Sequence, residues 1–252
     1  MPSLDCDGVK LHYEDDGAGP AVLLTHGFGA STGMWQGQVT VFANRYRLIR
    51  WDMRGHGGSD CPDDAALYSQ PRTVDDIAAI LNHLGIDKAV IGGHSLGGFM
   101  SLAFHARYPE RVQALFLQGC GPGYRNPEAR AQWNERAESR ARTLEADGLA
   151  VLGGGAEVKV SQHGTAQGLA NAARGILSQV DATVIDSLPG ISVPTLIIIG
   201  DADTPYLQGA DYMANRIPGA EHIVVPGAGH GVNVEKPDVV NAALEAFLAR
   251  AT

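Results

Sequence analysis

The chain has 252 residues, of which 44% are hydrophobic and 19% charged, and its 19 basic and 28 acidic side chains give a formal net charge of −9. This length and composition predict a soluble protein with one main domain and room for an insertion. Because the sequence lacks an apolar run of about 18 residues and a secretory leader, we expect no membrane span and a cytoplasmic location. The acidic balance disfavours nucleic acid and membrane surfaces as partners.

The three cysteines, Cys6, Cys61 and Cys120, are widely spaced and include no Cys-x-x-Cys pair. This pattern predicts neither a disulfide framework nor a zinc knuckle, so we expect reduced thiols. No other pattern calls for a metal ion or an organic cofactor.

Short β-branched runs alternate with amphipathic stretches along the chain. The runs predict strands at 9–13, 21–25, 46–51, 89–92, 114–118, 195–200 and 222–225. The amphipathic stretches predict helices at 34–43, 73–84, 96–107, 210–216 and 237–249. Thr73 and Asp76 form a capping-box pattern, which places a helix start at Thr73. This alternation predicts an α/β fold with a mostly parallel central sheet flanked by helices.

One segment breaks the alternation, because residues 121–189 are rich in Ala, Arg, Glu and Gln and contain no convincing strand. We therefore expect a core made of residues 1–120 and 190–252, with 121–189 as a helical cap insertion. An insertion after a strand lies over the crevice where α/β sheets bind ligands. The glycine run at 153–155 is a candidate hinge for a mobile lid. Several apolar cap residues face either the crevice or the cap's own interior, namely Trp133, Leu144, Leu149, Leu152 and Leu169.

The segment Gly93-His94-Ser95-Leu96-Gly97 follows a predicted strand and precedes a predicted helix. A sharp turn in that context pushes the serine hydroxyl out of the sheet, and it requires small residues two positions to either side. Ser95 is therefore a candidate nucleophile. The alternative is a serine that only caps the following helix.

A serine hydroxyl needs a neighbouring imidazole, itself oriented by a carboxylate, to take its proton. His230 lies in a glycine-rich loop after the strand predicted at 222–225, and Asp201 and Asp203 follow the strand predicted at 195–200. Either aspartate could instead form an Asx turn or a helix cap. The chain order Ser, Asp, His is the order of one hydrolase architecture.

Acyl transfer also needs two backbone N–H groups facing the developing oxyanion. The N–H of Leu96, directly after the candidate nucleophile, is one. The N–H of Phe28, between Gly27 and Gly29 after an early strand, is suited to be the other. We expect the side chains of Phe28, His94 and Trp133 to line the substrate pocket.

These motifs together resemble the α/β-hydrolase superfamily over nearly the whole chain. The resemblance rests on six ordered segments, which are His26 to Gly29, Trp35, Asp52 to Ser59, Gly93 to Gly98, Gly200 to Asp203, and Gly229-His230. It implies an α/β-hydrolase fold, and it selects Asp203 over Asp201, because the family's acid usually lies three residues after the glycine that ends its strand. It also implies that residues 52–59 buttress the oxyanion loop. Similarity to enol-lactonases and small carboxylesterases implies a small-molecule carboxylic ester or lactone as the substrate.

Some residues of the chain also resemble the motifs of other functions. The glycines at 27, 29 and 33, with Asp52, imitate a dinucleotide fingerprint, but their spacing is off by one and no Tyr-x-x-x-Lys pair is present. Ser95 excludes family members that use an aspartate nucleophile. Carbon–carbon bond hydrolases commonly carry tryptophan after the catalytic histidine, where Gly231 stands here. A carbon–carbon bond hydrolase stays open as an alternative, as does a slow-turnover ligand receptor or signalling protein of the same fold. No pattern specifies an oligomeric state.

The expected mechanism is a serine esterase cycle. Neutral His230, held by Asp203, removes the proton of Ser95, and the alkoxide attacks the ester carbonyl to form an acyl-enzyme that water hydrolyses. Because the base must be neutral, activity should fall on acidification through the histidine pKa, at about pH 6 to 7.

Overall fold

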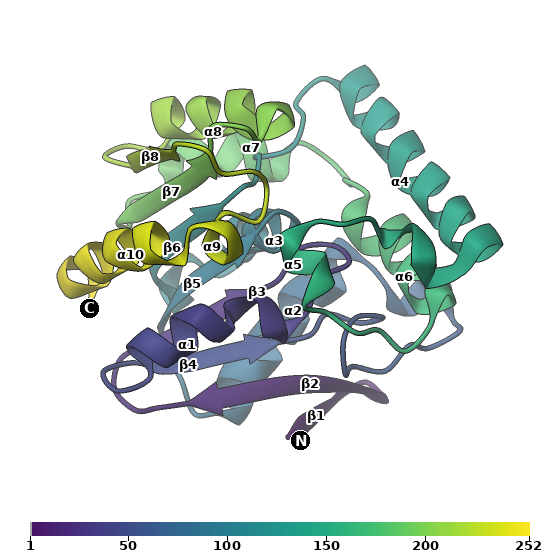
Figure 1. Ribbon diagram of the computed structural model, residues 1–252, viewed down its shortest axis with the longest axis horizontal. Helices are drawn as coiled ribbons and strands as arrows, with labels where there is room; N and C mark the ends of the chain where they lie inside the picture. Colours follow the sequence, from purple (N-terminus) through teal and green to yellow (C-terminus); the bar gives the residue numbers. More distant parts are fainter. Residues whose placement is uncertain (1) are drawn as a thin grey trace.

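A single sheet of eight strands organises the computed structural model, which describes residues 2–252 (Figure 1). The strand order is β1-β2-β4-β3-β5-β6-β7-β8. β1 and β2 pair with each other antiparallel, β2 pairs antiparallel with β4, and all other neighbours are parallel. The prediction of a mostly parallel sheet is confirmed. The strands are β1 (Ser3–Cys6), β2 (Val9–Asp16), β3 (Ala21–Thr25), β4 (Arg47–Trp51), β5 (Ala89–His94), β6 (Val112–Gln118), β7 (Thr195–Gly200) and β8 (Glu221–Val225).

Helices cover both faces of the sheet and one edge of it (Figure 1). The α-helices are α1 (Gln36–Phe42), α2 (Gln70–His83), α3 (Leu96–Arg107), α4 (Pro127–Asp147), α5 (Ala156–Lys159), α6 (Ala166–Ala172), α7 (Thr183–Ser187), α8 (Thr204–Arg216), α9 (Val232–Glu235) and α10 (Pro237–Ala251). Alternation along the buried strands sets the two cores, because successive side chains point to opposite faces. In β3, Val22 and Leu24 pack with α1 and α10, whereas Leu23 packs with α2, α3 and α8.

The structure differs from the prediction most clearly at β1, α2 and α8. The strand β1 was not predicted, since its alternating sequence Ser-Leu-Asp-Cys carries only two apolar residues. α2 begins at Gln70, where the Ser69 hydroxyl accepts the N–H of Arg72, so the helix start placed at Thr73 is wrong. Asp76 does not cap that helix, because its carboxylate binds Arg54. α8 begins at Thr204, six residues before the predicted start at Ala210.

The segment between β6 and β7 holds α4 to α7 and reaches over the carboxyl edge of the sheet (Figure 1). α4 and α6 build a small core of their own around Ala141, Leu144 and Leu169. Leu144 and Leu169 therefore pack in the interior of the cap and do not face the crevice. α7 packs on α3 of the main layer instead. We propose residues 121–189 as the cap unit, with α7 as its return to the core.

Within residues 2–252, no helix combines the length and the apolar composition needed to cross a bilayer.

Candidate active site

Ser95 lies at a strained turn between β5 and α3. Its backbone has φ 52° and ψ −114°, a region that non-glycine residues rarely adopt. Gly93 and Gly97 permit this turn, since a Cβ on Gly93 would clash with the backbone of Gly97 and one on Gly97 with the backbone of Thr25. The Ser95 hydroxyl does not cap α3. The turn therefore holds the side chain at the sheet's carboxyl edge, as the nucleophile prediction requires.

Asp203 and His230, the candidate acid and base, lie side by side after the ends of β7 and β8. Nδ1 of His230 and Oδ2 of Asp203 are 2.8 Å apart, and because a carboxylate only accepts, the imidazole donates. The Asp203 side chain is 4% exposed and that of His230 is 30% exposed. Oδ1 of Asp201 instead accepts the N–H of Gly227, across 2.8 Å, on the surface. The structure thus pairs Asp203, rather than Asp201, with His230.

His94 lies beneath this pair rather than in the pocket. Its buried ring donates from Nε2 to the carbonyl of His230, across 3.0 Å, and its ring centroid is 4.5 Å from that of His230. Burial lowers the pKa of His94 well below its usual range, so the ring is neutral near pH 7. His94 lines neither cavity at the site. The expectation that it lines the pocket is wrong, because its ring is buried and bound to the backbone of His230.

The loop after β3 is fixed by buried hydrogen bonds. His26 donates from Nδ1 to the carbonyl of Gly27, across 2.7 Å, and its Nε2 accepts the N–H of Met53 at 3.0 Å. A Cβ placed on Gly27 would lie 3.2 Å from that of Ser95, so this loop packs directly against the candidate nucleophile. Burial lowers the pKa of His26, which preserves the neutral ring that both bonds need.

The segment from Asp52 to Ser59 supports the same loop. The Asp52 carboxylate accepts the N–H of Thr32 at 2.7 Å and the N–H of Gly58 at 2.8 Å. From the cap, His163 donates to the carbonyl of Gly29 at 2.9 Å and accepts the N–H of Gly57 at 3.1 Å. The loop is therefore tied both to the core and to the cap.

Two backbone amides at the site are free to donate. In the part of the chain that the structure describes, neither the N–H of Phe28 nor that of Leu96 donates a hydrogen bond to the protein. Phe28 belongs to the loop beside Ser95, and Leu96 is the first residue of α3. Free donors next to a candidate nucleophile fit the requirement for oxyanion binding.

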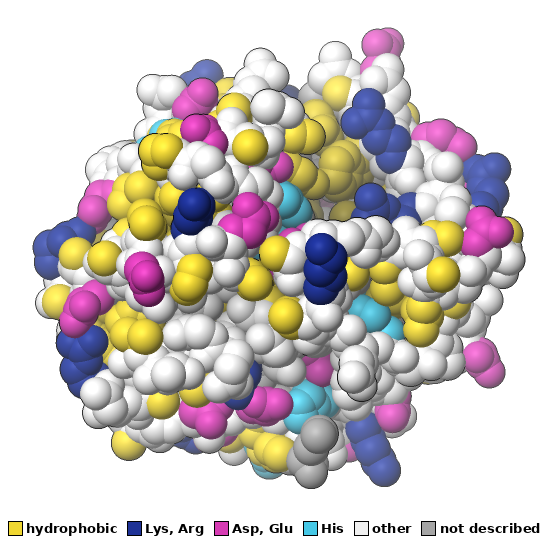
Figure 2. Space-filling model, viewed as in Figure 1, with side chains coloured by type: hydrophobic (Ala, Val, Ile, Leu, Met, Phe, Trp, Pro, Cys, Tyr) yellow, Lys and Arg dark blue, Asp and Glu magenta, His cyan; other side chains and the backbone are white. Residues whose placement is uncertain are grey.

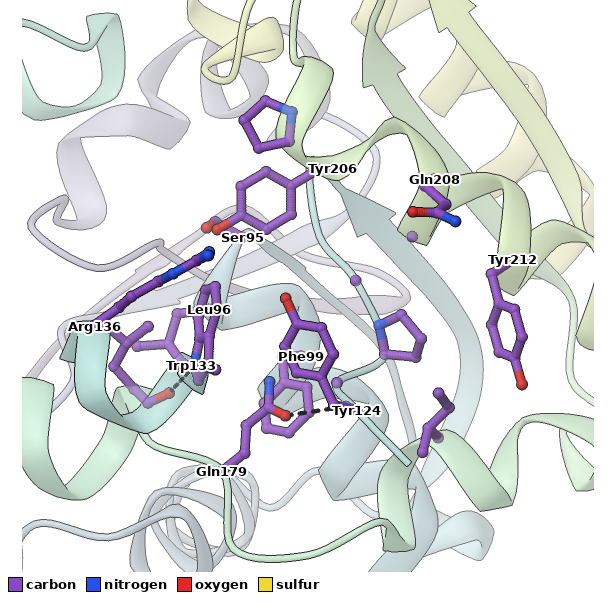
Figure 3. A pocket seen from close by; sticks show the side chains of 17 residues that line it. Ser95, Leu96, Phe99, Tyr124, Trp133, Arg136, Gln179, Tyr206, Gln208 and Tyr212 are labelled. Atoms are coloured by element: carbon purple, nitrogen blue, oxygen red, sulfur yellow. Dashed lines mark hydrogen bonds between the residues drawn. The ribbon is translucent and has the colours of Figure 1, made fainter. Parts of the chain in front are cut away.

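Tyr206, in the first turn of α8, is a site residue that the sequence did not reveal. Its ring stacks on His230, with centroids 4.8 Å apart and planes at 25°. Figure 3 shows its hydroxyl next to the Ser95 side chain. Burial raises the pKa of Tyr206, and the contact with Ser95 opposes part of that rise. If the sequence had predicted the start of α8 at Thr204 instead of Ala210, Tyr206 would have been placed one helical turn after Asp203 and thus near the site.

Two cavities meet at Ser95. The first is about 350 Å³ and lies between α3, α4 and α8 (Figure 3), and the second, about 420 Å³, extends under the cap. Both are lined by Ser95, Trp133, Arg136, Leu177 and Tyr206. Phe28, Leu152 and His230 line the second alone. Figure 2 shows this face hollowed between α8 and α4, with hydrophobic side chains inside and Lys or Arg side chains on the α4 side.

Among residues 2–252, no group of three or more His, Cys, Asp and Glu side chains is arranged to hold a metal ion. The described cysteines Cys6, Cys61 and Cys120 form no disulfide.

Comparison with known protein families decides the family. Residues 20–154, which include the Ser95 turn, match the model described as "alpha/beta hydrolase fold". This chain is a member of the α/β-hydrolase fold family. Residues 177–252 of this α/β hydrolase match a second model, described as "TAP-like protein", which covers Asp203 and His230.

Several proteins resemble this α/β hydrolase over nearly its whole length. 3-Oxoadipate enol-lactonase 2 of Acinetobacter baylyi is 30% identical, covering 98% of this chain and 96% of that protein. A thermophilic esterase from Thermogutta terrifontis is 29% identical in its solved structure, with a TM-score of 0.80 and coverage of 99% and 97%. The enol-lactonase from Burkholderia xenovorans is 26% identical, with a TM-score of 0.80 and coverage of 98% and 100%.

Proposed function

We propose that this protein is a serine hydrolase that cleaves a carboxylic ester or lactone through an acyl-enzyme on Ser95. The observation that carries the proposal is the pairing of His230 with buried Asp203 beside a serine in a strained turn. The relatives named as an esterase and as enol-lactonases support the same bond class. Small-molecule substrates are typical of the family, and two cavities beside Ser95 have room for one.

The proposed cycle starts with Asp203 holding His230 in the tautomer whose Nε2 is a free acceptor. Within the described residues the Ser95 hydroxyl has no hydrogen bond to His230. The Tyr206 hydroxyl lies beside Ser95 (Figure 3). Rotation of the Ser95 side chain toward Nε2 brings donor and base together, and such contacts commonly tighten only when substrate is bound.

Proton transfer to His230 lets Ser95 attack the ester carbonyl carbon. The carbonyl oxygen becomes an oxyanion that accepts from the amides of Phe28 and Leu96, interactions worth about 3 kcal/mol each in related sites. His230 then returns the proton to the leaving alkoxide oxygen, which departs as an alcohol. A water molecule, deprotonated by His230, hydrolyses the acyl-enzyme and restores Ser95.

A p-nitrophenyl ester series from acetate to octanoate tests this proposal, with Ser95→Ala as the control. We expect steady turnover of the short esters by the native protein and none above background by the variant. The dependence of kcat/KM on chain length then measures the acyl cavity. Turnover that survives in Ser95→Ala would overturn the assignment, and a stoichiometric burst without turnover would favour a slow receptor or signalling role instead.

A further inference from the structure

Helix α4 turns one face toward the two cavities. Arg136, Ala137 and Arg140 lie three, four and seven residues after Trp133, which is the spacing of a single helix face. All four line the second cavity, and Trp133 and Arg136 line the first as well. An apolar and cationic surface therefore forms one wall of the site.

The two cavity-facing arginines have no anionic partner in the protein. Among residues 2–252, the side chain of neither Arg136 nor Arg140 forms an ion pair or a hydrogen bond. Arg140 makes a cation–π contact with Phe28, and its guanidinium carbon lies 5.3 Å from the centroid of the Phe28 ring. Two unpaired guanidinium groups lie one turn apart on this wall, in a chain whose net charge is −9.

Three acidic residues of the same helix, Glu135, Glu138 and Glu145, form ion pairs with other arginines. Glu138 binds Arg142 and Arg174, and Glu145 binds Arg174. Arg142 also pairs with Glu135. These ion pairs lie along α4 and at its contact with the segment after α6. They do not involve Arg136 or Arg140, which face the cavity.

Both arginines act close to the candidate nucleophile. Figure 3 shows the Arg136 side chain extending across the cavity toward Ser95 and Tyr206. Arg140 is close enough that its charge opposes part of the rise that burial causes in the pKa of Tyr206. An anionic group held between the two guanidinium groups would lie within one small molecule's length of the Ser95 hydroxyl.

One acidic side chain, Glu157 of α5, also lines the second cavity. Its buried carboxylate packs against Gly155 and Gly231, where a Cβ on either glycine would clash with it. It lies within 4 Å of neither arginine, since no such ion pair is present among the described residues. Glu157 therefore forms no ion pair that would occupy either guanidinium group.

We propose that the second cavity binds a carboxylate of the substrate through Arg136 and Arg140, so that the preferred substrates are acidic esters or lactones. This rests on the proposed hydrolase function for its reaction. The guanidinium fork matches carboxylate geometry, and charge-assisted hydrogen bonds are about twice as strong as neutral ones. Both arginines are exposed when the cavity is empty, and a bound substrate with its apolar chain against Trp133 would remove water from them.

Monoethyl adipate and ethyl hexanoate give a matched pair of probes, because they differ by a carboxylate in place of a methyl group. Ester cleavage is followed by release of ethanol. We expect the native protein to prefer the half-ester in kcat/KM by about 10- to 100-fold, and Arg136→Gln, Arg140→Gln or the double variant to lose most of that preference, chiefly through KM. Equal kcat/KM for the two esters in the native protein would overturn the proposal.

Arg142→Gln is the control variant, since it removes the same charge from the same helix at a residue that pairs with Glu135 and Glu138. Arg142→Gln should keep the native preference for the half-ester. If this control loses the preference equally, the effect comes from the overall charge of α4 and not from the two cavity arginines, which also overturns the proposal. Raising the salt concentration should weaken the preference.

A binding experiment separates failure of this inference from failure of the hydrolase function. Calorimetry with Ser95→Ala measures affinity for monoethyl adipate without turnover. Binding that weakens at least 10-fold when Arg136 and Arg140 are replaced supports the anion site even if the native protein cleaves no ester. Cleavage of ethyl hexanoate without arginine-dependent binding of the half-ester leaves the hydrolase function standing and contradicts the carboxylate site.

Discussion

His230 donates a hydrogen bond to Asp203 across 2.8 Å, joining the loops that follow two neighbouring parallel strands. The neighbouring Asp201 binds only the N–H of Gly227. Asp203→Asn should therefore lower kcat by about 10³- to 10⁴-fold, because an amide stabilises the wrong tautomer of His230 and no imidazolium. Asp201→Asn should stay within about threefold of the native kcat.

Steady-state kinetics on p-nitrophenyl butyrate measure both variants, with circular dichroism to confirm that each folds. Equal losses, or a larger loss in Asp201→Asn, would show that the acid has been assigned to the wrong aspartate.

The stacking of Tyr206 on His230 predicts different effects for two substitutions. Tyr206→Phe keeps the ring, so we expect a kcat within about fivefold of the native value. Tyr206→Ala removes the aromatic face that orients the imidazole, and we expect kcat to fall about 10- to 100-fold at nearly unchanged thermal stability. A fall in kcat/KM that comes only from KM in Tyr206→Ala would instead make this residue a part of the cavity wall without a positioning role.

Most of the scaffold of the site could be predicted from sequence, because the buried strands are continuous apolar runs. The residues that sequence did not reveal depend on distant partners. Tyr206 was hidden because Thr204-Pro205 and Gly209 interrupt the helical pattern of early α8. Asp76 suggested a capping box, although the distant Arg54 takes its carboxylate.

Which arginines of α4 face the cavity could not be predicted from the sequence either. Arg136, Arg140 and Arg142 look alike in sequence. Only the position of Arg174, some thirty residues further along the chain, shows which acidic residues are already paired and which arginines are left for the cavity.

The buried pair of Arg54 and Asp76 predicts a large effect on stability. Two hydrogen bonds of 2.7 Å join these side chains, which are 2% and 3% exposed. Asp76→Ala leaves the guanidinium buried without its partner, and we expect the free energy of unfolding to fall by about 3–5 kcal/mol. Asp75→Ala on the same helix removes an exposed pair with Arg107 and should cost less than about 1 kcal/mol. Urea denaturation compares them, and similar midpoints would contradict the account.

The buried histidines predict a loss of stability in mild acid. Burial lowers the pKa of His26, His56 and His94 in the folded protein. Unfolded histidines protonate at a pKa of about 6.5, so below that pH the unfolded state binds more protons and unfolding becomes easier. Their contribution to stability is complete above about pH 7 and declines as the pH falls from about 6.5 toward the lowered folded pKa values.

Each such histidine should contribute a slope of up to about 1.4 kcal/mol per pH unit in this window. Urea denaturation at pH 7.5, 6.0 and 5.0 measures the slope, and His56→Phe should reduce it by the share of one histidine. If the pH dependence of the free energy of unfolding is unchanged in His56→Phe, or if stability rises on acidification from pH 7.5 to 5.0, the buried histidines are not neutral in the folded state.

The claim that Ser95 is a nucleophile activated by His230 is tested most directly by covalent labelling. A p-nitrophenyl dialkyl phosphate transfers one dialkylphosphoryl group to an activated serine oxygen and releases p-nitrophenol. Intact-mass measurement followed by peptide mapping should show one label per chain, located on Ser95, and labelling should slow strongly in Asp203→Asn and vanish in Ser95→Ala. A label that persists in Ser95→Ala, or no label in the native protein at reagent excess, would contradict the account.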